Sequence, residues 1–270
     1  MHCAKPARAD FRTMPPCRVI VTRPARDAAR WVEALQAAGL DAVALPLIAI
    51  EPVSDPTRLR AARTETGHHA ALMFVSAAAV EHFFAPDRSA APVPSVRCWA
   101  TGPGTVRALR EAGVPADAID APAPDAAQFD SEALWARVQP QMQAGTRVLI
   151  VRGGDASGQA TGRDWLARRI EAAGGVVEAL VAYRRLAPVL DPAARQLAME
   201  GAQGAATWLF SSSEAIGNLC RALPGVGWQA ARAVATHPRI AQAAQEAGFG
   251  TVRTSSPTVA ALVASIEFNA

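Results

Sequence analysis

Hydroxyl-bearing residues follow apolar segments at corresponding places in the two halves of this 270-residue chain. Ser76 precedes Ser212 by 136 positions, and Thr101 precedes Thr236 by 135 positions. A hydroxyl between a strand and a helix can cap the exposed N–H groups of the helix, and those N–H groups can also bind a carboxylate. Both roles stay open for the serines. For the threonines, a ligand contact and a local turn bond fit the pattern equally well.

Arginine and glycine residues stand at similar turns. Arg23 and Arg152 follow the first apolar segment of each half, where each could pair with a ligand carboxylate or with an acidic neighbour. Gly102 and Pro103 form a turn whose glycine admits close approach of a ligand. Lys5 is the only lysine against 26 arginines, which either genomic base composition or a carboxylate-rich ligand explains, since arginine binds carboxylates bidentately.

The elements that would position these residues alternate between strand and helix. Apolar runs predict strands, and apolar residues at helical spacing predict helices that end near Gly39, Gly113 and Gly248. The chain then reads as two copies of a βαβ–βα–βα unit, near 18–143 and 147–268, with Ser131 and Thr258 capping the last helix of each copy. This pattern predicts an α/β fold of parallel sheets covered by helices on both faces. Strands are expected at 18–22, 41–53, 147–151, 176–189, 207–210 and 232–236, and strand–helix pairs at 72–84 and 97–113.

Composition and charge argue against several classes of protein. The net charge of +3 is not gathered into a basic face, so we expect no nucleic-acid partner. Four cysteines form no C-x-x-C pair, no apolar run reaches 18 residues, and the first 16 residues lack a signal-peptide core, so we expect no zinc site, no membrane span and a cytoplasmic protein. The Gly153-Gly154 loop lacks the Walker lysine and the G-x-G-x-x-G order, which argues against nucleotide binding.

The order of several motifs resembles that of the uroporphyrinogen-III synthase family. No single piece is diagnostic, but together they cover nearly all of residues 17–268. The pieces are VIVTRP, LPLIAIEP, FVSAAAVEHFF, ATGPGTVRALREAG, VLIVRGG, VAYRRL, LFSSSEAIGNL, ATHPRIAQAAQEAGF and SSPTVAAL.

The resemblance implies a domain organisation that differs from two tandem repeats. It implies two flavodoxin-like domains joined by a two-stranded linker, with both chain ends in one domain and a ligand cleft between the domains, at the carboxyl ends of the strands. The expected parts are a flexible N-terminal tail (1–16), a discontinuous domain 1 (17–48 plus 186–270), a domain 2 (49–185) and linker strands near 46–53 and 181–189.

The implied activity is that of a cofactor-independent lyase. It is the dehydrating cyclisation of hydroxymethylbilane, a linear tetrapyrrole with eight carboxylates, to uroporphyrinogen III with inversion of ring D, in porphyrin and heme biosynthesis. The implied partners are this small-molecule substrate and, transiently, the upstream hydroxymethylbilane synthase, and we expect a monomer with no metal.

The resemblance also assigns site residues. Tyr183 is the predicted catalytic residue, because a tyrosine on a linker strand would face the cleft and could donate a proton to the departing hydroxyl. The family often has a Gly-Pro-Thr-type turn where this chain has His237-Pro238-Arg239, so Arg239 could pair with a substrate carboxylate in place of a hydroxyl contact. The expected substrate-binding residues are Arg23, Ser76, Thr101, Gly102, Pro103, Arg152, Ser211, Ser212, Thr236, His237 and Arg239.

Two alternatives come from other classes. A sensor built from two lobes could bind a small anion without turnover, and it would usually carry an attached output domain. A nucleotide-sugar or NAD enzyme would need a glycine-rich first turn, and residues 21–29 contain no glycine.

Overall fold

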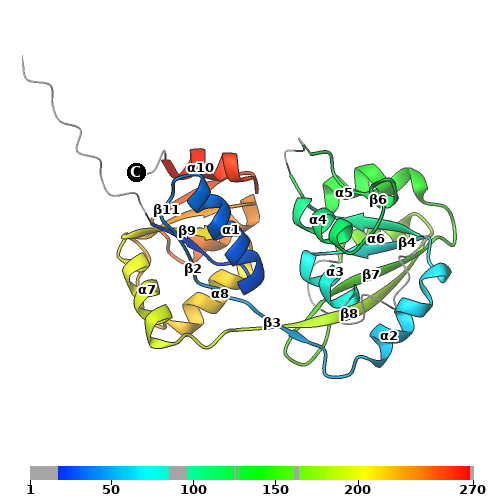
Figure 1. Ribbon diagram of the computed structural model, residues 1–270, viewed down its shortest axis with the longest axis horizontal. Coiled ribbons are helices and arrows are strands. Elements are labelled where there is room, and N and C mark those ends of the chain that lie inside the picture. Colours follow the sequence, from blue (N-terminus) through cyan, green and yellow to red (C-terminus); the bar gives the residue numbers. More distant parts are fainter. Residues whose placement is uncertain (1–17, 85–95, 125, 127, 161–163, 268–270) are drawn as a thin grey trace, which may run out of the picture. The chain divides into compact units, whose positions relative to one another are not determined.

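The computed structural model describes residues 18–84, 96–124, 126, 128–160 and 164–267, and it divides the chain into two units (Figure 1). Unit 1 combines Met1–Ile48 with Pro188–Ala270, and unit 2 is Ala49–Ala187. The blue start and the red end of the chain therefore share one unit (Figure 1). The predicted tail, residues 1–16, lies outside the described residues.

Unit 1 is a five-stranded parallel sheet with the strand order β11-β10-β9-β1-β2. The strand β1 is apolar and buried, with Val19, Ile20 and Val21 fully inaccessible, as expected for a parallel strand covered on both faces. Its strands are β1 (Arg18–Val21), β2 (Ala42–Ala44), β9 (Ala206–Phe210), β10 (Arg232–Ala235) and β11 (Thr251–Thr254). Its helices are α1 (Ala25–Ala37), α7 (Pro192–Ala202), α8 (Ser213–Ala222), α9 (Pro238–Glu246) and α10 (Val259–Glu267).

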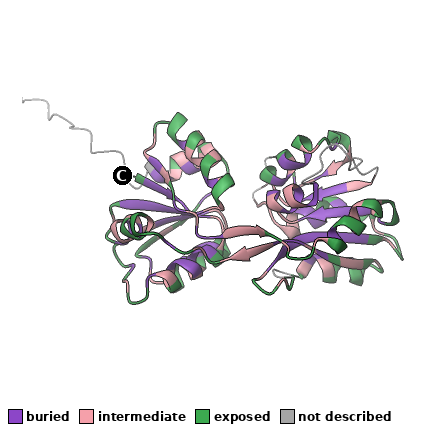
Figure 2. Ribbon diagram, turned by 60° about the horizontal axis from the view of Figure 1, so that its bottom comes forward, coloured by how far each residue is buried: buried purple, intermediate pink, exposed green. Residues whose placement is uncertain are grey.

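Unit 2 is a six-stranded sheet with the strand order β3-β8-β7-β4-β5-β6. All pairs are parallel except β3 with β8. Apolar clusters cover both faces of this sheet, and Figure 2 shows buried strands beneath helices whose outer surfaces are exposed. Its strands are β3 (Ala49–Pro52), β4 (Ala71–Phe74), β5 (Arg97–Ala100), β6 (Ile119–Asp120), β7 (Arg147–Gly154) and β8 (Val176–Leu186). Its α-helices are α2 (Thr57–Thr64), α3 (Ala77–Phe84), α4 (Pro103–Glu111), α5 (Ser131–Val138) and α6 (Trp165–Ala172), and its short 3₁₀ helices are η1 (Thr66–His68), η2 (Ala116–Ala118) and η3 (Gln139–Gln141).

Each sheet combines parts of both sequence repeats. In unit 1, β1 of the first repeat pairs with β9 of the second, with Val21 opposite Leu209. In unit 2, β7 of the second repeat pairs with β4 of the first, with Ile150 opposite Met73. Apart from β3, which has no counterpart in unit 1, the two strand orders correspond element by element, so the repeats have exchanged their first βαβ segments. The sequence copies at 18–143 and 147–268 are therefore not the spatial units.

The long strand predicted for residues 41–53 is interrupted. Strand β2 ends at Ala44, and the buried residues Leu45, Leu47 and Ile48 follow without strand pairing. The chain then enters the other sheet as β3, which pairs with β8 from Ala49 opposite Leu186. An uninterrupted apolar run does not reveal such a break, because buried strand and buried coil have the same composition.

Three local predictions at other elements can be compared with the structure. Strand β7 continues to Gly154, so Arg152 lies in the strand and not in a loop after it. Asp130, not Ser131, caps helix α5 and accepts a hydrogen bond from the N–H of Ala133 at 2.9 Å. The predicted capping of α10 by Thr258 is confirmed, since the N–H of Ala261 donates to Thr258 Oγ1.

No helix in the described part of the chain is long and apolar enough to cross a membrane.

Candidate functional site

Ser76 and Tyr183 form a hydroxyl pair at the carboxyl end of β4 in unit 2. Ser76 Oγ lies 3.0 Å from the Tyr183 hydroxyl, and it accepts a hydrogen bond from the N–H of Ala79, which makes it the cap of α3. The side chain of Tyr183 belongs to the core and is only 1% exposed. Within unit 2 the ring of Tyr183 is held by packing, and its hydroxyl points at the half-buried serine, while the expectation that Tyr183 faces a cleft stays a prediction.

Gly153 makes room for the Tyr183 ring. A Cβ atom at Gly153 would lie 2.7 Å from the ring carbons, which is closer than real side chains approach. The pairing of β7 with β8 also shifts register between Arg152 and Gly153, as a β-bulge does beside functional sites. The His82 ring also lies near Tyr183, with a centroid distance of 5.6 Å, and burial lowers the pKa of His82.

Arg152 is a buried cation at the same sheet edge. The residue is 7% exposed, and its Nη1 donates to Asp164 Oδ1 at 3.0 Å. Its Nε is also buried, and no described residue accepts a hydrogen bond from it. Arg23, the equivalent residue in unit 1, instead stacks its guanidinium 4.7 Å from the centre of the Trp31 ring. Arg152 thus has both an acidic neighbour and an unused donor, and the two roles considered for it remain compatible.

Thr101, Gly102 and Pro103 connect β5 to α4. Thr101 Oγ1 donates to the carbonyl oxygen of Val75 at 3.3 Å, which lies just after the neighbouring strand β4, so this bond is a contact between strand ends and not a local turn bond. Gly102 is the residue that precedes the helix, and a Cβ there would make only ordinary contact with Phe129, at 3.5 Å. Gly102 and Pro103 line one end of a hollow of about 390 Å³ on unit 2.

Unit 1 places its predicted residues at the equivalent sheet edge. Ser211 and Ser212 follow β9, but Ser212 makes no side-chain capping bond to α8, so the capping role that the sequence left open for it is not realised. Thr236 follows the neighbouring strand β10, and its N–H donates to the carbonyl oxygen of Phe210 at 3.0 Å. The hydroxyls of unit 1 therefore do not all serve as helix caps.

His237 caps helix α9 in place of a hydroxyl. Its Nδ1 accepts hydrogen bonds from the backbone N–H of Arg239 at 3.1 Å and from the Arg239 Nε at 3.4 Å. The side chain of Arg239 is exposed. The histidine thus organises the start of the helix, and the exposed guanidinium is in a position to meet an anionic ligand.

The predicted residues form two sets, one at the carboxyl edge of each sheet. Open α/β sheets bind their ligands beyond this edge, so both sets have the position of a ligand site. Unit 1 contributes Arg23, Ser211, Ser212, Thr236, His237 and Arg239, and unit 2 contributes Ser76, Thr101, Gly102, Pro103, Arg152 and Tyr183.

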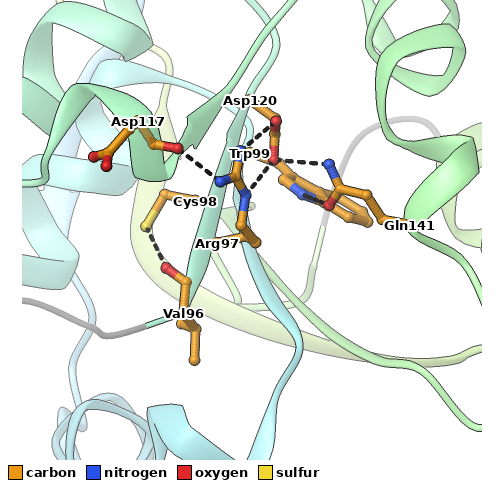
Figure 3. A network of polar contacts seen from close by, with 7 residues as sticks. All are labelled: Val96, Arg97, Cys98, Trp99, Asp117, Asp120 and Gln141. Atoms are coloured by element: carbon orange, nitrogen blue, oxygen red, sulfur yellow. Dashed lines mark hydrogen bonds and ion pairs between the residues drawn. The ribbon is translucent and has the colours of Figure 1, made fainter.

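A polar network that no sequence pattern indicated lies in the same unit 2 sheet (Figure 3). Arg97 donates to both carboxylate oxygens of Asp120, at 2.8 and 2.5 Å, and Gln141 donates to the same carboxylate at 3.0 Å. Gln141 in turn accepts from the indole N–H of Trp99. Burial alone would raise the pKa of Asp120, but the hydrogen bonds from Arg97 and Gln141 outweigh burial and lower it. The network joins the edge strand β6 to its neighbours, and its members are too far apart in sequence to form a motif.

Metal and thiol chemistry find no support in the described residues. No group of three or more His, Cys, Asp or Glu side chains there could hold a metal ion. Cys98 is buried, and burial raises the pKa of its thiol to about 12, so it stays protonated near neutrality.

Comparisons with known proteins agree on one family. The family model described as uroporphyrinogen-III synthase HemD matches residues 29–264. A curated uroporphyrinogen-III synthase of Chlorobaculum parvum is 30% identical over 187 residues, which cover 66% of this chain and 67% of that protein.

Solved structures give the same answer for the fold. A mutant uroporphyrinogen III synthase from Thermus thermophilus matches with a TM-score of 0.55 and 17% identity, over 93% of this chain and 98% of that one. The synthetase from Helicobacter pylori 26695 matches with a TM-score of 0.56 and 13% identity, over 93% and 99%. At these identities the likeness concerns the fold.

Proposed function

This chain belongs to the uroporphyrinogen-III synthase family, and we propose that it closes hydroxymethylbilane to uroporphyrinogen III mainly by positioning the substrate. The observation that carries the proposal is the family match over residues 29–264, which includes all but one of the site residues described above. The exception, Arg23, lies just before the matched range.

The reaction depends more on how the enzyme positions the substrate than on a strong nucleophile in the protein. The nitrogen of the pyrrole that carries the hydroxymethyl group expels the hydroxyl, which leaves as water once it gains a proton. The cation that remains on this first pyrrole is attacked by the pyrrole at the other end of the chain, ring D, through the ring carbon that already carries the bridge to its neighbour. This attack gives a spiro intermediate whose rearrangement inverts ring D. An enzyme that holds the chain so that this carbon is closest favours type III over type I. Positioning of this kind can contribute about 7–11 kcal/mol.

The protein can position the substrate by binding its carboxylates. In unit 1, the N–H groups at the starts of α8 and α9 and the hydroxyls of Ser211, Ser212 and Thr236 are suited to hold them. In unit 2, the unused Nε of Arg152 is a further donor. Each contact of a carboxylate with a helix start adds about 0.3–1 kcal/mol near a surface.

Tyr183 is proposed to act through Ser76. The tyrosine is buried, and its hydroxyl lies at hydrogen-bond distance from Ser76 Oγ. Donation from tyrosine to serine would orient the serine hydroxyl, and a proton delivered to the departing hydroxyl would pass along the same pair. The burial of the tyrosine and its contact with Ser76 favour the positioning role over direct contact with substrate.

Arg239 is proposed to bind a substrate carboxylate. Replacing it in Arg239→Ala removes the exposed guanidinium but keeps the backbone N–H that donates to His237. We expect the half-saturation concentration to rise several-fold with little change in turnover, because one charge-assisted contact is lost. Steady-state kinetics on the folded variant measure both, and an unchanged half-saturation concentration would remove Arg239 from the site.

The setting of the reaction is also part of the proposal. We propose a cytoplasmic monomer that contacts hydroxymethylbilane synthase transiently. The contact would shorten the time in which the free bilane closes unaided to the type I isomer. Sedimentation of the chain alone and with that synthase tests the oligomeric state and the contact.

The deciding experiment is an isomer assay. Freshly made hydroxymethylbilane is supplied to the protein, the products are oxidised, and the type I and type III isomers are separated by chromatography. A protein-dependent excess of type III is expected. Type I alone from a folded sample would contradict the proposal and favour the anion sensor.

A further inference from the structure

A groove on unit 2 includes two of the predicted site residues, Gly102 and Pro103, in its lining and has a volume of about 390 Å³. The rest of the lining comes from helix α4, from the chain around and after β6, and from α5. This size lies within the range of small-molecule sites, about 300–1,000 Å³. Val106, Ile119 and Phe129 give it apolar walls. The groove is thus continuous with the proposed site and has the apolar character that suits a pyrrole ring.

The polar part of the groove is positive. Arg107 and Arg110 enter its lining from α4, and Arg137 enters from α5. No acidic side chain lies in the described lining. Arg107 makes an ion pair with Glu111 at 3.6 Å, but both side chains are about half exposed, and such a pair is weak and readily exchanged. An apolar groove with guanidinium groups along it complements a ring that carries carboxylate arms.

The internal repeat shows that these charges belong to one unit only. Helix α4 corresponds to α9 of unit 1, since both begin at proline and are followed by glycine two residues after their last residue. The positions of Arg107 and Arg110 are occupied in α9 by Gln242 and Gln245. Glutamine keeps the helical contact, because Gln242 donates to Glu246 at 2.9 Å where Arg107 pairs with Glu111. The fold therefore does not require the arginines.

We propose that this groove binds one pyrrole of the tetrapyrrole together with its acetate and propionate arms, and that Arg107 and Arg110 pair with those carboxylates. The inference rests on the proposed function and deepens it. Because unit 1 carries glutamines at the same places, the charges would give the groove of unit 2 a preference for carboxylates that the equivalent surface of unit 1 lacks. Arg107 and Arg110 would then be specificity-determining residues.

The repeat also supplies the test. The variant Arg107→Gln/Arg110→Gln gives α4 the residues of α9, so we expect it to fold. A matched control, Arg58→Gln/Arg60→Gln, removes two exposed charges from α2 of the same unit. Binding of uroporphyrin III, the stable oxidised form of the product, is measured by fluorescence titration of the full chain. We expect the dissociation constant to rise at least tenfold in the groove variant, as for loss of charge-assisted contacts, and less than about twofold in the control.

A second ligand distinguishes the groove from a general loss of positive charge. Coproporphyrin III has methyl groups in place of the four acetates, so it gives the groove fewer carboxylates. We expect the preference of the native chain for uroporphyrin over coproporphyrin to shrink in the groove variant and to persist in the control. Kinetics on hydroxymethylbilane are expected to show a higher half-saturation concentration with turnover reduced less than about threefold.

Failure of this inference differs from failure of the proposed function. The groove proposal is overturned if the native chain forms type III product while the groove variant keeps dissociation constants and a half-saturation concentration within about twofold of native. In that case the proposed activity still stands. A native chain that forms no type III product overturns the function on which the groove rests.

Discussion

Gly153 and Tyr183 show how one residue without a side chain can fix another at a site. The ring of Tyr183 occupies the volume that a Cβ at Gly153 would need. We expect Gly153→Ala to destabilise the protein by about 1–3 kcal/mol, the usual cost of overpacking a core. The free energy of unfolding in urea measures this.

Gly104→Ala is the matched control. Gly104 lies in the first turn of α4, and nothing lies within 4 Å of the position a Cβ would occupy. Alanine there is expected to be neutral or to stabilise by about 0.4–1 kcal/mol. Equal destabilisation by both changes would contradict the steric account.

Tyr183→Phe separates the hydroxyl from the ring. The ring packing stays, while the contact with Ser76 is lost, so we expect a stability loss of only about 1 kcal/mol. The turnover of the folded variant is expected to fall as well, because the Ser76 hydroxyl would no longer be oriented, and so small a loss of stability would not by itself lower turnover. Unfolding and steady-state kinetics on the same sample compare the two effects. Native turnover in the variant would exclude a role for the hydroxyl.

Residue types could be assigned to turns from sequence, but their bonds could not. Thr258 caps its helix as predicted, and Ser76 has the capping role that was one of its two open alternatives. Ser131 does not, because the carboxylate of Asp130 stands one position earlier and accepts the bond. Ser212 follows the same strand–helix pattern as Ser76 and still makes no such bond. Which hydroxyl acts depends on a rotamer and on neighbours from distant strands, such as Tyr183 for Ser76.

At the scale of elements, the ion pair of Arg97 with Asp120 holds the two-residue strand β6 to β5. The Asp120 side chain is 4% exposed, so losing its cation leaves a buried charge with Gln141 as a remaining side-chain donor. We expect Arg97→Gln to destabilise the protein by about 1–3 kcal/mol at pH 7. Arg18→Gln is the control: it breaks an exposed pair with Asp41 and is expected to cost about 1 kcal/mol or less.

The difference in stability between the native chain and Arg97→Gln should depend on pH, because the pKa of Asp120 is lowered in the folded state. In the unfolded chain the pKa of an aspartate is about 3.9, so the pair stabilises the native state above this pH. The contribution is lost as the pH falls through the lower pKa of the folded state. Urea unfolding at pH 7 and near pH 3 should therefore show the difference between native and Arg97→Gln shrinking in acid. A difference that is constant with pH would contradict this assignment.

Helices and strands could largely be located from their periodicity, whereas their ends and partners could not. The predicted strand at 147–151 extends to Gly154 because β8 continues beside it, which no local pattern reveals. The groove arginines were missed for a different reason. Their signal is the contrast of Arg107 and Arg110 with Gln242 and Gln245, and it becomes visible only when α4 and α9 are aligned.

At the scale of the whole molecule, the exchange of repeat segments decides which fragments can fold. Residues 49–187 contain every strand of the unit 2 sheet and both of its apolar clusters. Residues 18–143 contain one complete sequence repeat but strands from two sheets. We expect the first fragment to unfold cooperatively in urea and the second to lack a cooperative transition, by circular dichroism. The opposite result would mean that the sequence repeat is the folding unit.

The residue pattern alone identified the repeat but did not fix how its parts are arranged in the two sheets. Matching positions such as Phe74 and Phe210 were correctly placed in equivalent strands, β4 and β9. Their strands nevertheless lie in different sheets, because β4 pairs with β7 and β9 pairs with β1. The repeat pattern is the same for either pairing, so only long-range contacts or a resemblance to a known family distinguishes the two arrangements.

The pairing of β1 with β9 also constrains the order in which parts of the chain can fold during protein synthesis. Arg18 leaves the ribosome long before Ala206, its partner in the register. Strand β2 pairs with one edge of β1 early, but at usual elongation rates, about 5–20 residues per second, the other edge of β1 is without β9 for roughly ten to forty seconds. Unit 2 is completed within that interval, and its antiparallel β3 and β8 bring Ala49 beside Leu186. The early folding of the inserted unit thus shortens the effective loop that β1 and β9 must close. Mutations that slow unit 2 would therefore leave β1 exposed to chaperones and to aggregation.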